Sequence, residues 1–217
     1  MGYGCCIRIW GEMALFTRPE CKAERVSYNV ITPSAARGII EAVFWHPGMR
    51  YVIDKITVLK PVRFDAVRRN EVGAKATLGA ISRAGKHGGP LYLSAPDERQ
   101  QRASVILRDV EYLVDFHFEL MPDRLGKNDD EKKFYNILLR RLRQGQHHAQ
   151  PCLGAREFPA YVSLVEPGEE RPESAYKGVA EHDLGFMLYD IDYDRDCTPL
   201  FFHAVMRDGE IVPEVRR

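Results

Sequence analysis

Two stretches of the sequence carry side chains that could do chemistry, and the first lies at the exit of an expected helix. In the stretch EAVFWHPGMRY, Trp45 and His46 follow apolar residues and precede Pro47-Gly48, which ends the helix. An imidazole ring titrates near neutral pH, and an indole ring can stack on a nucleobase. His46 is therefore a candidate acid or base, and Trp45 is a candidate base-stacking residue. The alternative is that this stretch is only the way one helix ends.

The second stretch is the basic run of residues 132–156, which holds two lysines, four arginines and two histidines but no acid. Helical spacing places Lys133, Asn136, Arg140 and Arg143 on one side of a helix, roughly opposite an apolar side. Most cations of this helix have no acid four residues away. Because unpaired ammonium and guanidinium groups suit phosphates, this face predicts a nucleic-acid contact, and a solvated face is the alternative.

Motifs for nucleotide hydrolysis or metal catalysis are absent: the sequence has no P-loop, no G-x-S-x-G, no H-E-x-x-H and no D-x-D cluster. The five cysteines lack the spacing of a zinc site, so we expect no metal and no cofactor. Basic and aromatic side chains remain. They permit attack of an RNA 2′-hydroxyl on the adjacent phosphate, which needs a base, an acid and cations at the phosphorane.

The elements that must position these residues follow from the pattern of apolar residues. Alternation predicts strands at 3–10, 51–59, 62–69, 105–120, 161–165, 186–193 and 201–206. Helices are expected from Thr32-Pro33 to Pro47-Gly48 and at 130–143, and glycines and prolines indicate a long mobile loop at 73–100. This order predicts an α+β fold, with a ferredoxin-like (RRM-like) βαββαβ domain at 1–160 and a small C-terminal antiparallel β-sheet at 161–217.

Bulk composition narrows the class of protein only a little. The 217 residues include 31 basic and 31 acidic side chains, so the net charge of zero gives no argument for a polyanionic partner. No run approaches the roughly 18 apolar residues of a membrane span, and the N-terminus lacks the apolar core of a signal peptide. We therefore expect a soluble, cytoplasmic protein with no membrane partner.

Several longer stretches carry a resemblance to a known family. They are WGEMALFTRPE (10–20), ERVSYNVITPSAARGIIEAVFWHP (24–47), VIDKITVLKPVRF (52–64), KKFYNILLRRLRQG (132–145) and LGAREFPAY (153–161). In these the chain resembles the CRISPR-associated repeat-RNA endonuclease of subtype I-C (Dvulg), the d form of the fifth Cas protein family in the RAMP superfamily. The resemblance implies metal-independent cleavage of repeats in precursor CRISPR RNA (crRNA), leaving a 2′,3′-cyclic phosphate and a 5′-hydroxyl. It also implies retention on the crRNA 5′ handle as a subunit of the type I-C surveillance complex.

The resemblance also implies a catalytic tyrosine at the end of the first helix and a Lys-His pair at the start of the second. Those positions hold Phe44, Lys133 and Phe134 in this sequence. A phenylalanine can neither give nor take a proton, so two of the three roles need substitutes. We assign Lys133, His46 and Tyr135 as the catalytic candidates, with a core position as the alternative for Tyr135.

The expected partners follow from the same resemblance. They are the precursor crRNA repeat hairpin and the other subunits of the surveillance complex, and double-stranded DNA is a further partner that the family allows. The candidate RNA contacts are Arg37, Arg140, Arg143, Arg156 and Trp45. The alternative function is a non-catalytic subunit that binds crRNA or DNA in the complex.

Overall fold

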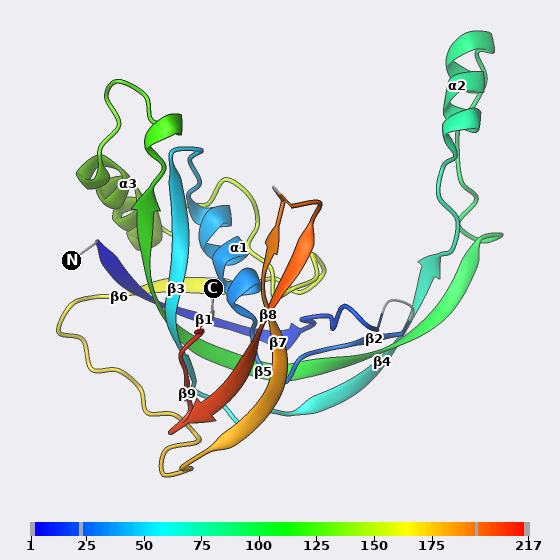
Figure 1. The fold of residues 1–217 in the computed structure, drawn as a ribbon. Coiled ribbons are helices and arrows are strands. Elements are labelled where there is room, and N and C mark those ends of the chain that lie inside the picture. The colour runs from blue at the N-terminus through cyan, green and yellow to red at the C-terminus, as the bar shows by residue number, and fades with distance from the viewer. Residues whose placement is uncertain (1–2, 22–23, 194, 215–217) are drawn as a thin grey trace.

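A computed structural model describes residues 3–21, 24–193 and 195–214 of the chain (Figure 1). The strands are β1 (Gly4–Ala14), β2 (Arg25–Val26), β3 (Met49–Val58), β4 (Phe64–Val72), β5 (Arg99–Leu120), β6 (Tyr161–Val165), β7 (His182–Asp192), β8 (Thr198–Arg207) and β9 (Glu210–Ile211). The helices are α1 (Pro33–Val43), α2 (Leu78–His87) and α3 (Glu131–Gln144), with a 3-10 turn at Pro122–Arg124. The protein is thus a mixed α/β structure with one large sheet and few helices.

The 22-residue strand β5 organises the sheet, because four other strands (β1, β2, β3 and β4) pair with it. Its second half pairs antiparallel with β1 on one side and with β3 on the other. Its first half pairs antiparallel with β4 and parallel with the short β2. The main strand order is β6-β1-β5-β3-β9-β8-β7, so the antiparallel strands β7, β8 and β9 continue the large sheet through the pairing of β9 with β3.

The helices α1 and α3 form where the sequence provides caps. The Thr32 hydroxyl accepts a hydrogen bond from the Ala35 backbone N–H, and a proline follows at the first position of α1. Asp130 caps α3 in the same way, and Gly145 closes it in the left-handed conformation, at a φ of 62°. Both helices therefore begin close to the expected residues.

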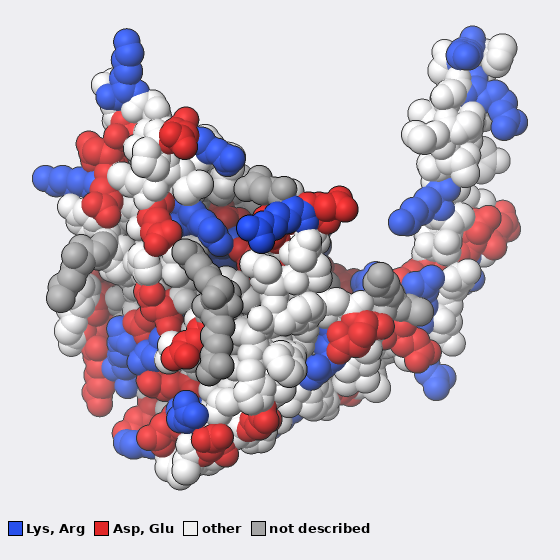
Figure 2. Space-filling model, in the orientation of Figure 1, with Lys and Arg blue, Asp and Glu red and all other residues white. Residues whose placement is uncertain are grey.

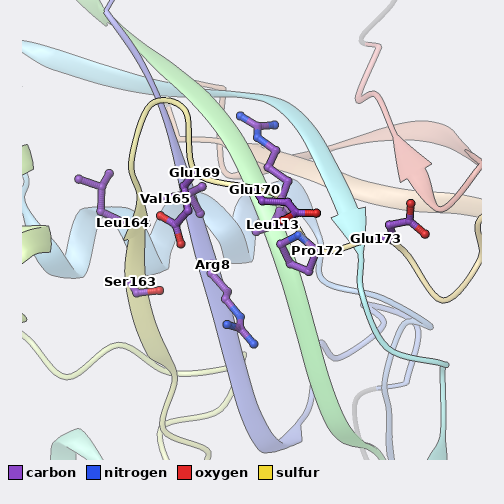
Figure 3. A pocket seen from close by; sticks show the side chains of 10 residues that line it. Arg8, Leu113, Ser163, Leu164, Val165, Glu169, Glu170, Pro172 and Glu173 are labelled. Carbon is purple, nitrogen blue, oxygen red and sulfur yellow. The ribbon is translucent and has the colours of Figure 1, made fainter.

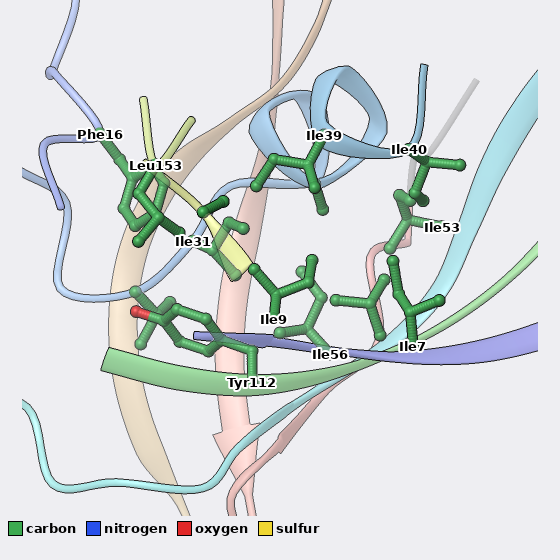
Figure 4. Packing of buried hydrophobic residues seen from close by; sticks show 14 of the residues in the cluster. Ile7, Ile9, Phe16, Ile31, Ile39, Ile40, Ile53, Ile56, Tyr112 and Leu153 are labelled. Atoms are coloured by element: carbon green, nitrogen blue, oxygen red, sulfur yellow. The ribbon is translucent and has the colours of Figure 1, made fainter. Parts of the chain in front are cut away.

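Both helices cover the same face of the sheet. Helix α1 packs against β3 and β7, and α3 packs against β6 and α1. Alternation along the strands sends every second side chain to this face, where aliphatic and aromatic side chains together form the core (Figure 4). Its centre includes Ile7, Ile9, Ile39, Ile40, Ile53, Ile56 and Tyr112.

The sequence predicted a long loop at 73–100, and this prediction is corrected because the segment contains helix α2 (Leu78–His87). Strand β4 runs to Val72, β5 begins at Arg99, and α2 lies between them, so the segment forms an arm that extends from the rest of the protein (Figure 1). Thr77 caps α2 by accepting a hydrogen bond from the Ala80 N–H. Gly79 and Gly85 lie inside α2 and favoured a loop in the sequence, although the helix is amphipathic; none of its residues is buried.

No helix in the described part of the chain is long and apolar enough to cross a membrane.

Candidate functional site

The chain after α1 places the side chains of Phe44, Trp45 and His46 in three different environments. Phe44, the C-cap, is extended, and its buried ring packs into the core, while its carbonyl accepts a hydrogen bond from the Tyr51 hydroxyl at 3.0 Å. The next side chain, Trp45, is 54% exposed. His46 then begins a tight turn, in which its carbonyl accepts from the Met49 N–H at 3.1 Å. The helix exit therefore presents one indole and one imidazole beside each other in sequence.

The structure brings His46 and Lys133 together on one carboxylate. Nε2 of His46 lies 3.5 Å from Oδ2 of Asp129, and Nζ of Lys133 donates to Oδ1 of Asp129 at 3.0 Å. Both donors keep solvent access, since the side chains of His46 and Lys133 are 30% and 45% exposed. We call His46, Asp129 and Lys133 the α1-exit cluster. Sequence reasoning missed Asp129, although its i,i+4 spacing to Lys133 was a usable signal.

Hydrogen bonds from the chain hold Asp129 ionised. The Gly126 backbone N–H donates to its Oδ2 at 2.9 Å, and this bond, followed by the one from Lys133, lowers the pKa of the Asp129 carboxyl. A carboxylate that is harder to protonate is a poor proton acceptor. Asp129 is therefore suited to holding the two cationic or donor groups in place rather than to acid–base chemistry.

The two ring nitrogens of His46 have different partners. Nδ1 accepts a hydrogen bond from the Gly48 backbone N–H at 3.1 Å. A neutral ring in this arrangement carries its proton on Nε2, where it points toward Asp129. The lone pair on Nδ1 is therefore occupied by the Gly48 N–H, and Nε2 lies 3.5 Å from the Asp129 carboxylate.

Phe134 forms the apolar floor of the cluster. Its ring centroid lies 4.6 Å from that of His46 and 6.1 Å from that of Phe44, and the side chain is fully buried. Arg141 also reaches this region, because its Nη1 donates to the Val43 carbonyl at 2.7 Å and its guanidinium lies 5.3 Å from the Phe44 ring. Helix α1 has no basic residue in its own last turn, so Arg141 supplies from α3 the positive charge that a helix C-terminus favours.

Tyr135 lies apart from the α1-exit cluster. Two residues along a helix turn a side chain by about 200°, so Tyr135 and Lys133 point to opposite sides of α3. The Tyr135 ring packs against Tyr3 at 4.7 Å between ring centroids, and its hydroxyl lies near the thiol of Cys5. Burial raises the pKa of Tyr135, and burial also raises the pKa of Cys5 to about 11. These contacts place Tyr135 on the side of α3 that packs against the start of β1.

The candidate RNA-binding cations differ in whether an acidic side chain already pairs with them. Arg140 and Arg156 are exposed and make no ion pair with any residue that the structure describes. Arg37 is paired with Asp190 of β7 and with Glu41 at 3.3 Å.

Arg143 was expected to lack an acidic partner, and this expectation was wrong. Two nitrogens of its guanidinium donate to the two carboxylate oxygens of Glu166, at 2.7 and 2.9 Å. The acid comes from a loop 23 residues away, which a search at helical spacing could not find. Figure 2 shows acidic and basic side chains interspersed on the viewed face, so this side of the protein carries no continuous basic surface.

Fold and site together define a single-sheet α/β protein with a histidine–carboxylate–lysine cluster where α1 ends and α3 begins. A family model described as CRISPR-associated protein (Cas_Cas5) matches residues 4–214. The chain belongs to this Cas5d family of CRISPR-associated proteins.

Two curated relatives match almost the whole chain. The chain is 47% identical over 208 residues to "CRISPR pre-crRNA endoribonuclease Cas5d" from Mannheimia succiniciproducens, covering 94% of this chain and 92% of that protein. It is 41% identical over 222 residues to the protein of the same name from Thermus thermophilus, covering 94% and 88%.

Solved structures resemble the fold over its full length. A CRISPR-associated protein has a TM-score of 0.75 and 25% identity, covering 99% of this chain and 93% of that one. A functionally uncharacterized protein from Streptococcus mutans has a TM-score of 0.71 and 29% identity, with the same coverage.

Proposed function

We propose that this protein is a metal-independent endoribonuclease that cleaves CRISPR repeat hairpins in precursor crRNA. The observation that carries the proposal is the 47% identity, over 94% of the chain, to a protein named as a pre-crRNA endoribonuclease. The expected products are a 2′,3′-cyclic phosphate and a 5′-hydroxyl. The protein then remains on the crRNA 5′ handle as a subunit of the type I-C surveillance complex.

The α1-exit cluster supports this chemistry through the donors it gathers. In the reaction the RNA 2′-oxygen forms a bond to the adjacent phosphorus, and the bond from phosphorus to the 5′-oxygen breaks. Lys133 stabilises the charge on the phosphorane and protonates the departing 5′-oxygen. For Lys133 to do so, the scissile phosphate takes over the partner position that Asp129 occupies at 3.0 Å.

The proton of the 2′-hydroxyl needs an acceptor, and we assign this role to His46. Because Nδ1 of His46 accepts from the Gly48 N–H, the ring can take up that proton only after this hydrogen bond breaks. Substrate binding must therefore turn the imidazole. Phe44 and Phe134 cannot take part, since both rings are buried and neither carries a titratable group.

The experiment that tests the proposal mixes the protein with its repeat hairpin in excess EDTA and analyses the ends of the products. Cleavage to a cyclic phosphate, abolished by a 2′-deoxy substitution at the scissile nucleotide, supports the endoribonuclease. Tight binding with intact RNA supports the second candidate, a non-catalytic subunit that binds crRNA or DNA. The buried phenylalanines at both of the family's proton-transfer positions are the observation that favours this alternative.

Further parts of the proposal concern the RNA contacts. Trp45, Arg140 and Arg156 are exposed and suited to bases and phosphates. Arg37 and Arg143 would have to exchange a carboxylate partner for a phosphate. Tyr135, the third catalytic candidate, could act only on a substrate that reaches the other side of α3. We also propose double-stranded DNA as a second ligand and a cytoplasmic location.

We also propose that β1, α1, β3, β5, α3 and β6 form a ferredoxin-like unit. The support is the strand order β6-β1-β5-β3, all antiparallel, with α1 after β1 and α3 after β5. The proposed division at 160/161 would follow this unit, except that β6 (Tyr161–Val165) pairs with β1 and so contributes to the first part.

A further inference from the structure

An aromatic pair lies on the face of the sheet opposite the helices. Trp10 of β1 and Tyr161 of β6 are directly paired in register, and their rings stack at 5.7 Å between centroids with an interplanar angle of 22°. Ile7 and Ile9 are fully buried under the helices, so alternation along β1 turns Arg8 and Trp10 to the other face. Tyr161 is 56% exposed, so much of its ring is open to solvent.

A hollow of about 420 Å³ lies on the same face of the sheet, over Arg8 and Ser163 (Figure 3). These two residues are the next register pair on this face of β1 and β6 after Trp10 and Tyr161. Arg8 and its register partner Ser163 line its floor, and the segment that carries Glu169 and Glu170 forms its rim. The Arg8 guanidinium lies 5.5 Å from the centroid of the Trp10 ring. A guanidinium and a hydroxyl thus line the hollow, and the guanidinium connects it to the stacked rings next to it.

The charged side chains that line this hollow indicate what kind of chemical group it could bind. The hollow is lined by two cations, and both have acidic partners: Nε of Arg8 donates to Glu111 at 2.7 Å, and Arg171 donates to Asp115 at 2.8 and 3.0 Å. Glu170 makes no ion pair within the part of the chain that the structure describes. Carboxylates repel phosphates but accept hydrogen bonds from amino groups, as they do from the exocyclic amino group of a base. The hollow therefore fits the base of a nucleotide and not its phosphate.

Aromatic faces provide the other half of such a site. Every nucleobase has a π-face, and single-stranded RNA is bound largely by stacking of unpaired bases on exposed aromatic rings and guanidinium planes. A duplex cannot use the pair, because its bases are already stacked on each other.

We propose that Trp10 and Tyr161, with the hollow beside Arg8 and Ser163, form a binding site for an unpaired amino-bearing base of single-stranded RNA: adenine, cytosine or guanine. This inference rests on the proposed function, because it assigns the site to a single-stranded flank of the repeat hairpin. It separates recognition of the flank, on the open face of the sheet, from chemistry at the α1-exit cluster.

The test compares two RNAs, the repeat hairpin with a single-stranded flank and the same hairpin trimmed to its stem and loop. Wild-type protein is expected to bind the flanked hairpin more tightly. Tyr161→Ala is expected to weaken this binding by about 5- to 150-fold, the usual effect of removing one stacking ring, and to leave affinity for the trimmed hairpin unchanged. Tyr161→Phe keeps the ring and should retain most of the affinity.

A matched control is Phe186→Ala, which removes another exposed ring, on β7, away from the pair. A flank of uridines, which lack the amino group, should bind more weakly than a flank of adenines, and Glu170→Gln should reduce that difference. Melting temperatures of all variants report on folding independently of RNA.

The outcomes separate this inference from the proposed function. If the wild-type protein neither binds nor cleaves either hairpin, the proposed function fails. If it binds and cleaves, but Tyr161→Ala binds the flanked hairpin as tightly as wild type, only the base site is overturned. Loss of a protein partner in Tyr161→Ala, with RNA affinity intact, would also overturn it and assign the pair to protein contact.

Discussion

Replacing Lys133 with alanine tests the role of the α1-exit cluster in RNA cleavage. Nζ of Lys133 donates to Asp129 at 3.0 Å and to the Asn128 carbonyl at 3.3 Å, so the charge is held at one point at the start of α3. Removal of one such preorganised donor from a developing anionic centre slows a reaction by about 10²- to 10³-fold. We expect a loss of this size in the rate of repeat-RNA cleavage.

The same change should hardly affect the fold. The cap of α3 is made by the Lys133 backbone N–H, which donates to Asp130 at 2.7 Å and survives the substitution. An exposed i,i+4 pair stabilises a protein little, so the melting temperature should fall by no more than about 2 °C. A large loss of activity with an unchanged melting temperature is the expected signature.

The assay is single-turnover cleavage of end-labelled repeat RNA in EDTA, with affinity measured separately. Lys132→Ala is the matched control, because Lys132 is the neighbouring exposed lysine and makes no ion pair in the described residues. Lys133→Arg keeps the charge and should recover part of the rate. The reasoning is refuted if Lys133→Ala cleaves within about threefold of wild type, or if Lys132→Ala is equally impaired.

Three further predictions concern stability, RNA affinity and pH. Gly154→Ala should lower the free energy of unfolding in urea by about 1–3 kcal/mol more than Gly145→Ala; both glycines have positive φ, but only at Gly154 would the new Cβ overlap a backbone carbonyl. Equal losses would contradict this. Arg140→Ala should reduce the salt slope of RNA binding by about 1, whereas Arg143→Ala should reduce it less, because that guanidinium is held by a carboxylate. Equal reductions in binding titrations across salt concentrations would contradict this expectation. The pKa of Asp129 is lowered by hydrogen bonds from the Gly126 N–H and from Lys133. These bonds should therefore be fully present above the ordinary aspartate pKa and be lost only as the pH falls through the lowered value. An NMR titration in which this carboxyl titrates at or above the ordinary value would oppose that expectation.

Much of the fold was predictable because its elements have local causes. The caps at Thr32 and Asp130 and the alternation along β1 and β5 are readable in sequence. The elements α1, α3 and β1 begin within one residue of the expected positions, whereas β5 begins at Arg99, six residues before the predicted 105. The arm was missed because the glycines of residues 73–100, two of them inside α2, favoured a loop, and α2 buries none of its residues against the core. The separation of Tyr135 from Lys133 could have been foreseen from helix geometry alone.

The sequence by itself determined the family, the two covering helices and the presence of His46 and Lys133 near helix ends. Only the tertiary structure decided what these residues touch. The joining of His46 to Lys133 through Asp129, and the pairing of Arg143 with Glu166, depend on where loops pass after strands have found their register. The physical reason is that helix and strand periods fix which way a side chain points along its own element, whereas a partner from another element is fixed only by the packing of the whole sheet.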